Sequence, residues 1–250
     1  MKVAWFETRE WHREYIDSRH EIDFYEGLLQ EHELERYDAV SVFVNSEVDR
    51  GFIESIRPEK ILCRSSGYDN VDMAAAEELG VEVYNVPEYG SETVAEYTLS
   101  LLLNMSKKLC SDIGKKPGED GHEGFELKNK TLGVIGAGRI GREVIKRAKA
   151  FDMEVLAYDP YPDEKAAEEL GYSYFDLEDL LSASDFVSIN CPLTDATQHL
   201  LSEEQFRLME GVKLVNTARG EVVDSESLYQ ALQDGSVAYV ALDVVEDERE

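Results

Sequence analysis

Positively charged side chains are scarce in this sequence. Among its 250 residues, 25 are lysine or arginine and 53 are aspartate or glutamate, which gives a formal net charge of −28 at pH 7. Nucleic acid and anionic membranes bind clusters of lysine and arginine, so this balance argues against either as a partner. It indicates a well-hydrated, strongly soluble surface. Adaptation to a salty cytoplasm is a second interpretation, because salt screens the repulsion among the acids.

Cysteine, histidine and long apolar runs are also scarce. Cys63, Cys110 and Cys191 are an odd number without paired spacing, which argues against a disulfide framework or a cysteine zinc site. The five histidines form no HxxxH or HxH pattern, so no metal site is predicted. The N-terminus has too short an apolar run for a signal peptide, and no stretch approaches the roughly 18 apolar residues of a membrane span. A reducing cytoplasm is the expected location.

Short apolar runs alternate with helical patterns along the whole chain. Strands are predicted at 2–7, 39–45, 60–66, 81–86, 131–137, 154–160, 185–192, 213–219 and 239–245. Helices are predicted at 72–79, 91–110, 139–151, 163–170, 176–183, 202–209 and 225–233. This alternation is typical of parallel sheets with crossover helices, so the fold class is α/β with two Rossmann-like parallel-sheet units.

The expected domain organisation follows from the same pattern. Residues 1–91 form one α/β domain, and residues 92–113 form a connecting helix whose apolar residues cover much of its circumference. Residues 114–250 form the second domain, which begins with a glycine-rich, charged loop at 114–130. No internal repeat or low-complexity tract is visible.

A glycine motif opens the second domain. The stretch "GVIGAGRIGREV" places Gly136, Gly138 and Gly141 as GxGxxG, after an apolar strand and at the start of a predicted helix. Gly136 permits a tight turn, Gly138 lets a diphosphate approach the backbone, and Gly141 lets helix and strand pack closely. The helix N-terminus adds free N–H groups and partial positive charge. The alternative is a glycine-rich turn without a ligand, which this context disfavours.

An acid at the end of the next strand completes a dinucleotide site. Asp159 follows Gly141 by 18 residues and can accept hydrogen bonds from both ribose hydroxyls of an adenosine. Its charge would repel a 2′-phosphate, so NAD is the predicted cofactor and NADP is disfavoured. Without a ligand, Asp159 would be a turn residue before Pro160.

Four long segments resemble the D-2-hydroxyacid dehydrogenase family. They are "RSSGYDNVD" (64–72), "NVPEYGSETVAEYTLSLLL" (85–103), "CPLTDATQHLLSEEQFRLMEGVKLVNTARG" (191–220) and "NTARGEVVDSESLYQALQDGSVAYVALDVVEDE" (216–248). The resemblance covers nearly the whole chain. It implies a flavodoxin-like substrate domain, an NAD-binding Rossmann domain and a connecting helix that helps to form a homodimer.

Two residues carry catalytic roles by this resemblance. Arg219 would bind the substrate carboxylate and polarise its carbonyl, which suits the permanently charged guanidinium fork. Its alternative is a structural ion pair. Glu248 lies 29 positions later and matches the acid that hydrogen-bonds the catalytic histidine and raises its pKa. Without the resemblance, Glu248 would be one more solvated glutamate in an acidic tail.

The resemblance also assigns residues to the cofactor. Asp243 matches the residue that holds the nicotinamide amide, and a carboxylate inside an apolar strand needs a partner. Contact with the diphosphate is implied for Arg139 and Ile140, with the adenosine half for Cys191, Pro192 and Thr197, and with the nicotinamide for Thr217 and Ala218.

On the substrate side, backbone N–H groups of Ser66 and Gly67 are expected to bind a carboxylate, and Gly67 allows close approach. Tyr89 matches a tyrosine of the D-lactate dehydrogenase branch, and its alternative is a surface aromatic. Tyr97 stands where many relatives have a histidine, at a position expected to lie away from the chemistry.

The acid/base of the family is a histidine that follows the matched glutamate. No histidine follows His199, which itself falls in the loop on the adenosine side, and none of His12, His20, His32 and His122 lies in a matching segment. The last strand of the Rossmann sheet and a returning helix are also not found, which would leave the strand at 239–245 as an apolar edge. We therefore expect that the sequence is a fragment of a complete dehydrogenase, able to bind NAD but to turn over poorly or not at all.

The predicted function is NAD-dependent interconversion of a small 2-oxo acid, such as pyruvate, and a D-2-hydroxy acid. The alternative is a non-catalytic protein of the same family that senses NAD, as corepressors do. The unmatched histidine favours the alternative, whereas Arg219 and Glu248 argue against it. A phosphorylated substrate is disfavoured because the sequence shows few cations for it.

Overall fold

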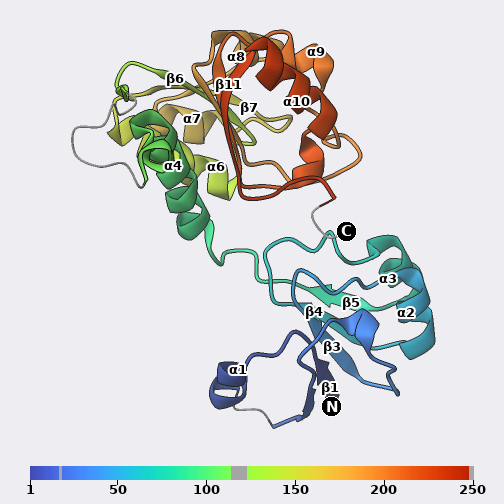
Figure 1. Cartoon of the computed structure of the whole chain (residues 1–250). Helices are drawn as coiled ribbons and strands as arrows, with labels where there is room; N and C mark the ends of the chain where they lie inside the picture. The colour runs from blue at the N-terminus through green and yellow to red at the C-terminus, as the bar shows by residue number, and fades with distance from the viewer. Residues whose placement is uncertain (17–18, 114–122, 248–250) are drawn as a thin grey trace. The chain divides into compact units, whose positions relative to one another are not determined.

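The computed structural model describes residues 1–16, 19–113 and 123–247. The chain divides into two compact units, Met1–Gly90 and Ser91–Glu250, here called unit 1 and unit 2 (Figure 1). The long helix that the sequence predicts as a connection between domains packs on unit 2, where it contacts the helix that follows the glycine motif.

Unit 1 is built on one parallel sheet. Its strands are β1 (Lys2–Trp5), β2 (Glu21–Phe24), β3 (Ala39–Val42), β4 (Lys60–Cys63) and β5 (Glu82–Tyr84). Their order is β2-β1-β3-β4-β5, and every neighbouring pair is parallel. This is the flavodoxin-like order, in which the direction of winding reverses between β1 and β3.

Short helices cover the sheet of unit 1. They are α1 (Glu10–Tyr15), the 3₁₀ turn η1 (Leu29–Glu31), α2 (Arg50–Ile56) and α3 (Met73–Leu79). Asp49 and Asp72 cap α2 and α3 by accepting the N–H groups of Phe52 and Ala75. The core gathers the fully buried β3 strand with residues such as Phe6.

Unit 2 has a six-stranded parallel sheet. Its strands are β6 (Thr131–Ile135), β7 (Glu154–Tyr158), β8 (Ser173–Tyr174), β9 (Phe186–Ile189), β10 (Val212–Asn216) and β11 (Val237–Leu242). The order is β11-β10-β9-β6-β7-β8. Counted from β6, this is the 3-2-1-4-5-6 order of dinucleotide-binding Rossmann domains, with its switch point between β6 and β9.

Helices cover both faces of this sheet. They are α4 (Ser91–Lys107), α5 (Leu109–Asp112), α6 (Arg139–Ala150), α7 (Glu164–Leu170), α8 (Leu177–Ala183), α9 (Glu203–Phe206), the 3₁₀ turn η2 (Gly220–Val222) and α10 (Ser225–Asp234). Phe186 packs with residues of α4 and α6 in one core, and its neighbour Val187 packs with α8 and α10 in another. Successive strand residues point to opposite faces, which explains why the buried strands lack polar alternation.

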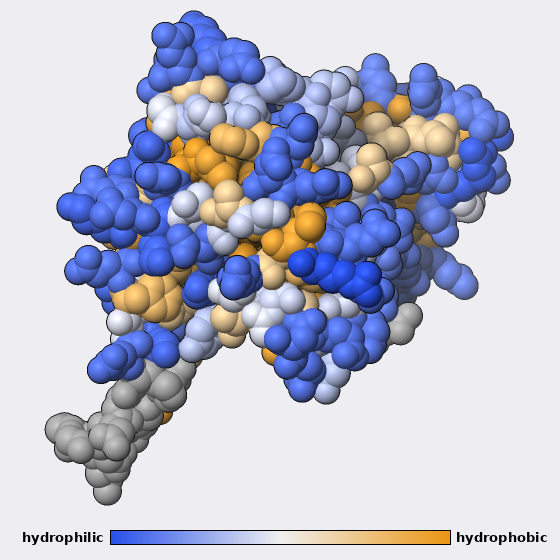
Figure 2. Space-filling view, turned by 90° about the horizontal axis from the view of Figure 1, so that it is seen from above, coloured by the Kyte–Doolittle hydropathy of each residue, from blue (hydrophilic) through white to orange (hydrophobic). Residues whose placement is uncertain are grey.

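The face shown in Figure 2 is mostly hydrophilic, with apolar areas between the charged side chains. Within the described ranges, none of the helices is long and apolar enough to cross a membrane. The three cysteines are free.

The elements differ from the sequence-based prediction mainly at the sheet edges. Strands β2 and β8 are absent from that prediction, because both are short and partly polar edge strands. Helices α1 and α2 lie between predicted strands, where helical segments are expected without stated bounds. The predicted strand at 239–245 ends at Leu242. In the predicted loop at 114–130, residues 114–122 lie outside the described residues, and 123–130 contain neither helix nor strand.

Candidate active site

The predicted cofactor residues of unit 2 and the predicted catalytic Arg219 lie at one edge of its sheet, where the strands have their carboxyl ends. They follow the carboxyl ends of β6, β7, β9, β10 and β11, which meet at the same edge because all the strands are parallel. Ligands of open α/β sheets bind at this edge, next to the switch point.

The glycine turn after β6 is held between neighbouring backbones. Gly136 has φ +91°, and a Cβ on it would lie 2.7 Å from the N atom of Cys191. A Cβ on Gly141 would lie 2.0 Å from the carbonyl oxygen of Gly136. The end of β9 and the first turn of α6 therefore both press against the glycine turn, which leaves no room for side chains at these two positions.

Gly138 differs from its two partners because a Cβ there would meet nothing within 4 Å. It is the N-cap of α6 and supplies no side-chain cap, so N–H groups of the first turn remain available. Arg139 and Ile140, predicted to lie along the diphosphate, are the first two residues of that turn. An open surface in front of uncapped N–H groups fits a diphosphate.

Asp159 binds the glycine turn directly. Its Oδ2 accepts the N–H of Ala137 and its Oδ1 accepts the N–H of Tyr161, both at 2.9 Å. A carboxylate has about four lone-pair sites, so both oxygens can accept a further hydrogen bond. The acid predicted to select the ribose therefore also orders the turn predicted to hold the diphosphate.

The turn after β10 is ordered by the buried side chain of Asn216. Its Oδ1 accepts the N–H of Ala218 at 3.0 Å, and its Nδ2 donates to the carbonyl of Arg219 at 2.8 Å. The hydroxyl of Thr217 lies 2.8 Å from that of Thr98 on α4. Arg219 itself donates from Nη1 to the carbonyl of Ala218 at 2.7 Å. The sequence analysis did not single out Asn216 or Thr98, whose roles depend on contacts within the fold.

Gly220 brings the segment after β11 close to Arg219. A Cβ on Gly220 would lie 2.1 Å from the carbonyl carbon of Val245, so the two backbones are in direct contact. The N–H of Asp243 donates to the carbonyl of Asn216 at 2.9 Å. Glu248, the predicted acid, lies outside the described residues.

Asp243 does not lie inside a buried strand, contrary to the prediction. The sequence predicts that it interrupts a buried strand, but β11 ends one residue earlier, and Asp243 is exposed. Its carboxylate therefore needs no buried partner. Its predicted role rests on its position directly after the carboxyl end of β11.

The loop after β9 contains Cys191, Pro192 and Thr197. The Thr197 hydroxyl donates to the carbonyl of Pro192 at 2.7 Å and accepts the N–H of Thr194 at 2.8 Å. Burial raises the pKa of the Cys191 thiol to about 11, so it stays protonated at pH 7 and can only make contact.

The predicted substrate residues of unit 1 lie on two adjoining segments after β4 and β5. The carbonyl of Ser66 accepts the Asn85 amide at 2.7 Å, and its hydroxyl donates to the carbonyl of Pro87 at 3.3 Å. The Ser65 hydroxyl donates to the carbonyl of Gly67 at 2.6 Å. Tyr89 is 56% exposed and lines a cavity of about 480 Å³ within unit 1.

Comparison with known proteins decides the family. Residues 99–250 match the family model described as "D-isomer specific 2-hydroxyacid dehydrogenase, NAD binding domain". D-lactate dehydrogenase of Escherichia coli K12 is 36% identical over the whole chain, which spans 80% of that enzyme's length. The chain belongs to the D-isomer specific 2-hydroxyacid dehydrogenase family.

Solved structures of this family share the fold. The D-lactate dehydrogenase of Aquifex aeolicus, solved with NAD and lactic acid, is 34% identical and aligns with a TM-score of 0.90 over 99% of this chain and 78% of its own. D-3-phosphoglycerate dehydrogenase of Methanocaldococcus jannaschii is 40% identical over 91% of this chain and 45% of its own. The family, the two-sheet α/β fold and NAD as the cofactor of residues 99–250 are confirmed. The individual site residues remain predictions.

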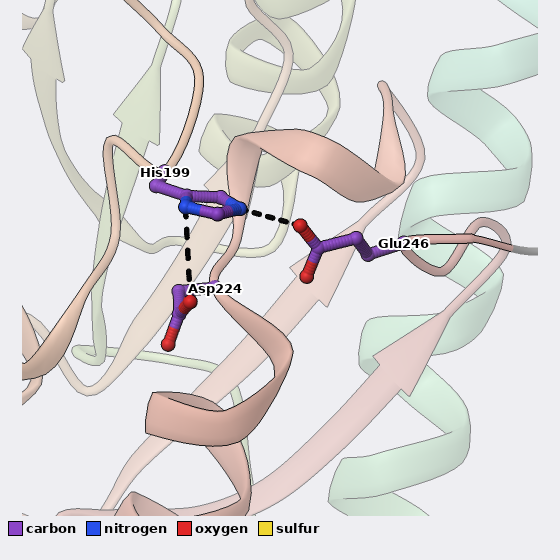
Figure 3. Close-up of side chains that lie close together, drawn as sticks. All are labelled: His199, Asp224 and Glu246. Atoms are coloured by element: carbon purple, nitrogen blue, oxygen red, sulfur yellow. Dashed lines mark hydrogen bonds and ion pairs between the residues drawn. The ribbon is translucent and has the colours of Figure 1, made fainter.

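A histidine that the sequence analysis set aside joins three segments of this family member. His199 Nε2 lies 2.5 Å from Glu246 Oε1, and its Nδ1 lies 3.7 Å from Asp224 Oδ2 (Figure 3). The second oxygen of Glu246 accepts the N–H of Ser225 at 3.2 Å. The three side chains could group around a metal ion. However, Nε2 lies at hydrogen-bond distance from Glu246 and Nδ1 at ion-pair distance from Asp224, which is the arrangement of a protonated ring between two carboxylates.

This cluster predicts a pH-dependent contribution to stability. The hydrogen bond to Glu246 raises the pKa of His199 above 6.5, and the same bond lowers the pKa of Glu246 below 4.5. The histidine contribution is complete below pH 6.5 and is lost as the pH rises through its folded value. The glutamate contribution is complete above pH 4.5 and is lost as the pH falls through its folded value. The ion pair between His199 and Glu246 is therefore strongest between about pH 4.5 and pH 6.5.

We expect His199→Gln to lower the free energy of unfolding at pH 6 by at most about 1 kcal/mol, because the pair is partly exposed. The melting temperature should fall by at most about 2–4 °C at pH 6 and by less at pH 9. Differential scanning calorimetry at both pH values measures this, and Glu246→Gln with the double variant completes a thermodynamic cycle. A loss of equal size at both pH values would contradict the ionic interpretation.

Proposed function

We propose that this protein is an NAD-dependent D-2-hydroxyacid dehydrogenase that interconverts a small 2-oxo acid, such as pyruvate, and the corresponding D-2-hydroxy acid. One observation carries most weight. The open Gly138 surface, Asp159 and the Arg219 turn lie along one edge of a sheet with dinucleotide-binding order. Relatives named D-lactate dehydrogenase support the substrate class. The homodimer implied by the resemblance and the cytoplasmic location expected from the composition belong to this proposal.

The proposed roles of the residues in this chain are as follows. The N–H groups at the start of α6 hold the diphosphate, and Asp159 holds the adenosine ribose. NADH, when bound, supplies a hydride to the carbonyl carbon. Arg219 binds the substrate carboxylate and polarises the carbonyl, which stabilises the negative charge that develops on its oxygen. Ser66 and Gly67 offer backbone N–H groups to a carboxylate of the substrate.

The reduction also consumes one proton, because a 2-oxo acid, NADH and a proton give a 2-hydroxy acid and NAD. His199 is the one histidine in the described part of unit 2. Since both of its ring nitrogens face carboxylates, we assign it to structure and not to proton transfer.

Cofactor absorbance near 340 nm tests the proposal, because it follows the oxidation of NADH. We expect the complete gene product to oxidise NADH with pyruvate, glyoxylate or hydroxypyruvate, and to reduce NAD with D-lactate but not L-lactate. Saturable NADH binding without turnover of any 2-oxo acid would favour the NAD-sensing alternative. A well-folded protein without saturable NADH binding would contradict both functions.

Asp159→Asn is expected to reduce the preference for NADH over NADPH by about tenfold or more, because the charge that repels the 2′-phosphate is lost. Asparagine retains one oxygen that can accept the N–H of Ala137, so the glycine turn should persist. Parallel fluorescence titrations with NADH and NADPH measure the preference.

Asp152→Asn is a matched control for this variant. Asp152 precedes β7 and so lies at the amino ends of the strands, away from the predicted cofactor residues. Its carboxylate pairs with Lys128. Its removal should leave the preference unchanged. An equal change in both variants would mean that overall charge, and not the ribose contact, sets the selectivity.

A further inference from the structure

The cavity of unit 1 is built differently from the rest of this acidic protein. Its lining includes Trp5, Trp11, His12, Arg64 and Tyr89. Arg9 and Arg64 contribute two positive charges to the lining and Glu7 one negative charge, although acids outnumber bases by 53 to 25 in the whole chain. A net positive, aromatic cavity of this kind suits an anionic ligand.

The cavity is also placed where the fold favours a ligand. Trp5 ends β1, and Phe43 follows β3, so the lining includes both sides of the switch point between these strands. Ligands of flavodoxin-like sheets bind at this point, outside the carboxyl ends of the strands. Its volume of about 480 Å³ equals that of about 16 water molecules, so a three-carbon acid would fill only a small part of it.

Arg64 is the central charged group. Its guanidinium carbon lies 4.4 Å from the centre of the Trp5 ring, Nη1 donates to Ser41 Oγ at 2.9 Å, and Nη2 donates to the carbonyl of Phe6 at 2.7 Å. Burial lowers the pKa of Arg64 to about 10, so it stays charged at pH 7. These contacts hold the fork rigidly and leave further N–H donors for a ligand.

No carboxylate of the described residues pairs with Arg64. Glu7 is the nearest candidate, but its two oxygens accept the N–H groups of Phe43 and Asn45 at 2.8 and 3.2 Å. A half-buried guanidinium that has only the longer-range attraction of Glu7, and no ion-pair contact, is costly. A carboxylate brought by a ligand would remove that cost, whereas an apolar or aromatic group would leave it.

The geometry points to the distal carboxylate of a dicarboxylic 2-oxo or 2-hydroxy acid as the group that binds Arg64. This inference rests on the proposed function for the reacting end of the molecule. Arg64 precedes Ser66 by two residues, so their Cα atoms are at most about 7 Å apart. Tyr89 lines the same cavity. One carboxylate on the Ser66 and Gly67 N–H groups and the other on Arg64 would place both ends of one ligand in unit 1.

Tryptophan fluorescence of the full chain tests this directly, because the only two tryptophans, Trp5 and Trp11, both line the cavity. D-malate and D-lactate are a matched pair of ligands that differ by one carboxylate. At constant ionic strength we expect a saturable change with D-malate, at a Kd at least about tenfold below that of D-lactate. Equal responses to the two acids would overturn the inference, as would a response to D-phenyllactate without one to D-malate.

Arg64→Met should weaken D-malate binding by about tenfold or more, and the matched control Arg50→Met should leave it unchanged. Arg50 lies on α2 and pairs with Glu54 and Glu78, outside the cavity. If Arg64→Met fails to fold, Arg64→Lys replaces it, because it removes the planar fork that binds a carboxylate. Unchanged D-malate binding in the folded cavity variant would overturn the inference.

The same variants separate this inference from the proposed function. Arg64→Met should bind NADH like the parent, because the cofactor residues lie in unit 2, and should lower kcat/KM for oxaloacetate about tenfold more than for pyruvate. Parent protein that binds NADH and reduces pyruvate without binding D-malate would refute the dicarboxylate site alone.

Discussion

Gly138→Ala is expected to weaken NADH binding by about 10- to 100-fold, the effect of displacing one or more charge-assisted hydrogen bonds to a diphosphate. A Cβ at Gly138 meets nothing within 4 Å, so the variant should fold normally, and only a ligand on that surface would meet the methyl group. Fluorescence titration with NADH measures the loss of affinity.

Gly141→Ala is the matched control within the same motif. Its Cβ would lie 2.0 Å from the Gly136 carbonyl oxygen, so it should destabilise the fold by about 2 kcal/mol or more and lower the melting temperature by about 4 °C or more. Gly138→Ala should change the melting temperature by less than about 2 °C. If both variants destabilise equally, or if Gly138→Ala binds NADH like the parent, the diphosphate does not lie over Gly138.

Gly138 and Gly141 belong to a part of the site that is formed by residues close together in the sequence. The glycine motif and Asp159 could be predicted because the spacing of a strand, a turn and a helix within one crossover unit determines their positions. The N–H of Ala137 on the Asp159 carboxylate adds a link that spacing alone does not show. Their contact with a cofactor is still a prediction.

The fold class was predictable for a similar reason. Buried parallel strands produce continuous apolar runs, and runs such as those of β3, β6 and β9 are strong signals. The edge strands β2 and β8 lack this signal, since one face of each meets solvent or polar neighbours. The order of the strands follows from the resemblance to the family but not from the apolar runs, because pairing depends on contacts between distant segments.

Strand order explains what sequence reasoning missed. Trp5, Phe43 and Arg64 belong to β1, β3 and β4 or to the residues just after them, and only the sheet brings them around one cavity. Nothing in the spacing of these residues indicates a cluster. The contact between Gly220 and Val245 is likewise produced by the pairing of β10 with β11.

The Gly220 contact connects the fold to the proposed chemistry. Asn216 orders the backbone of Arg219, and Gly220 then lies against the segment that leads to Glu248. Any side chain at Gly220 would push that segment away from the Arg219 turn. The proposed catalytic arginine is thus positioned by a buried amide on one side and by a close backbone contact on the other.

Arg219→Gln is expected to lower kcat/KM for pyruvate by about 10²- to 10³-fold, because the variant loses the charge that polarises the carbonyl. Arg219→Lys should recover only part of this, since an ammonium group cannot replace the planar fork at a carboxylate. NADH affinity should stay within about threefold of the parent, because the guanidinium is proposed to bind substrate and not cofactor. Stopped-flow measurements of NADH oxidation provide the rates.

Binding of oxamate, an unreactive analogue of pyruvate, to the NADH complex gives a second readout that needs no turnover. Arg219→Gln should abolish it at concentrations that saturate the parent. Arg207→Gln is the control for lost charge in unit 2, because Arg207 is largely exposed and pairs with Glu203 on α9, and it should change neither readout. Oxamate binding that survives in Arg219→Gln would assign the carboxylate to the Ser66 and Gly67 N–H groups alone and would remove Arg219 from substrate recognition.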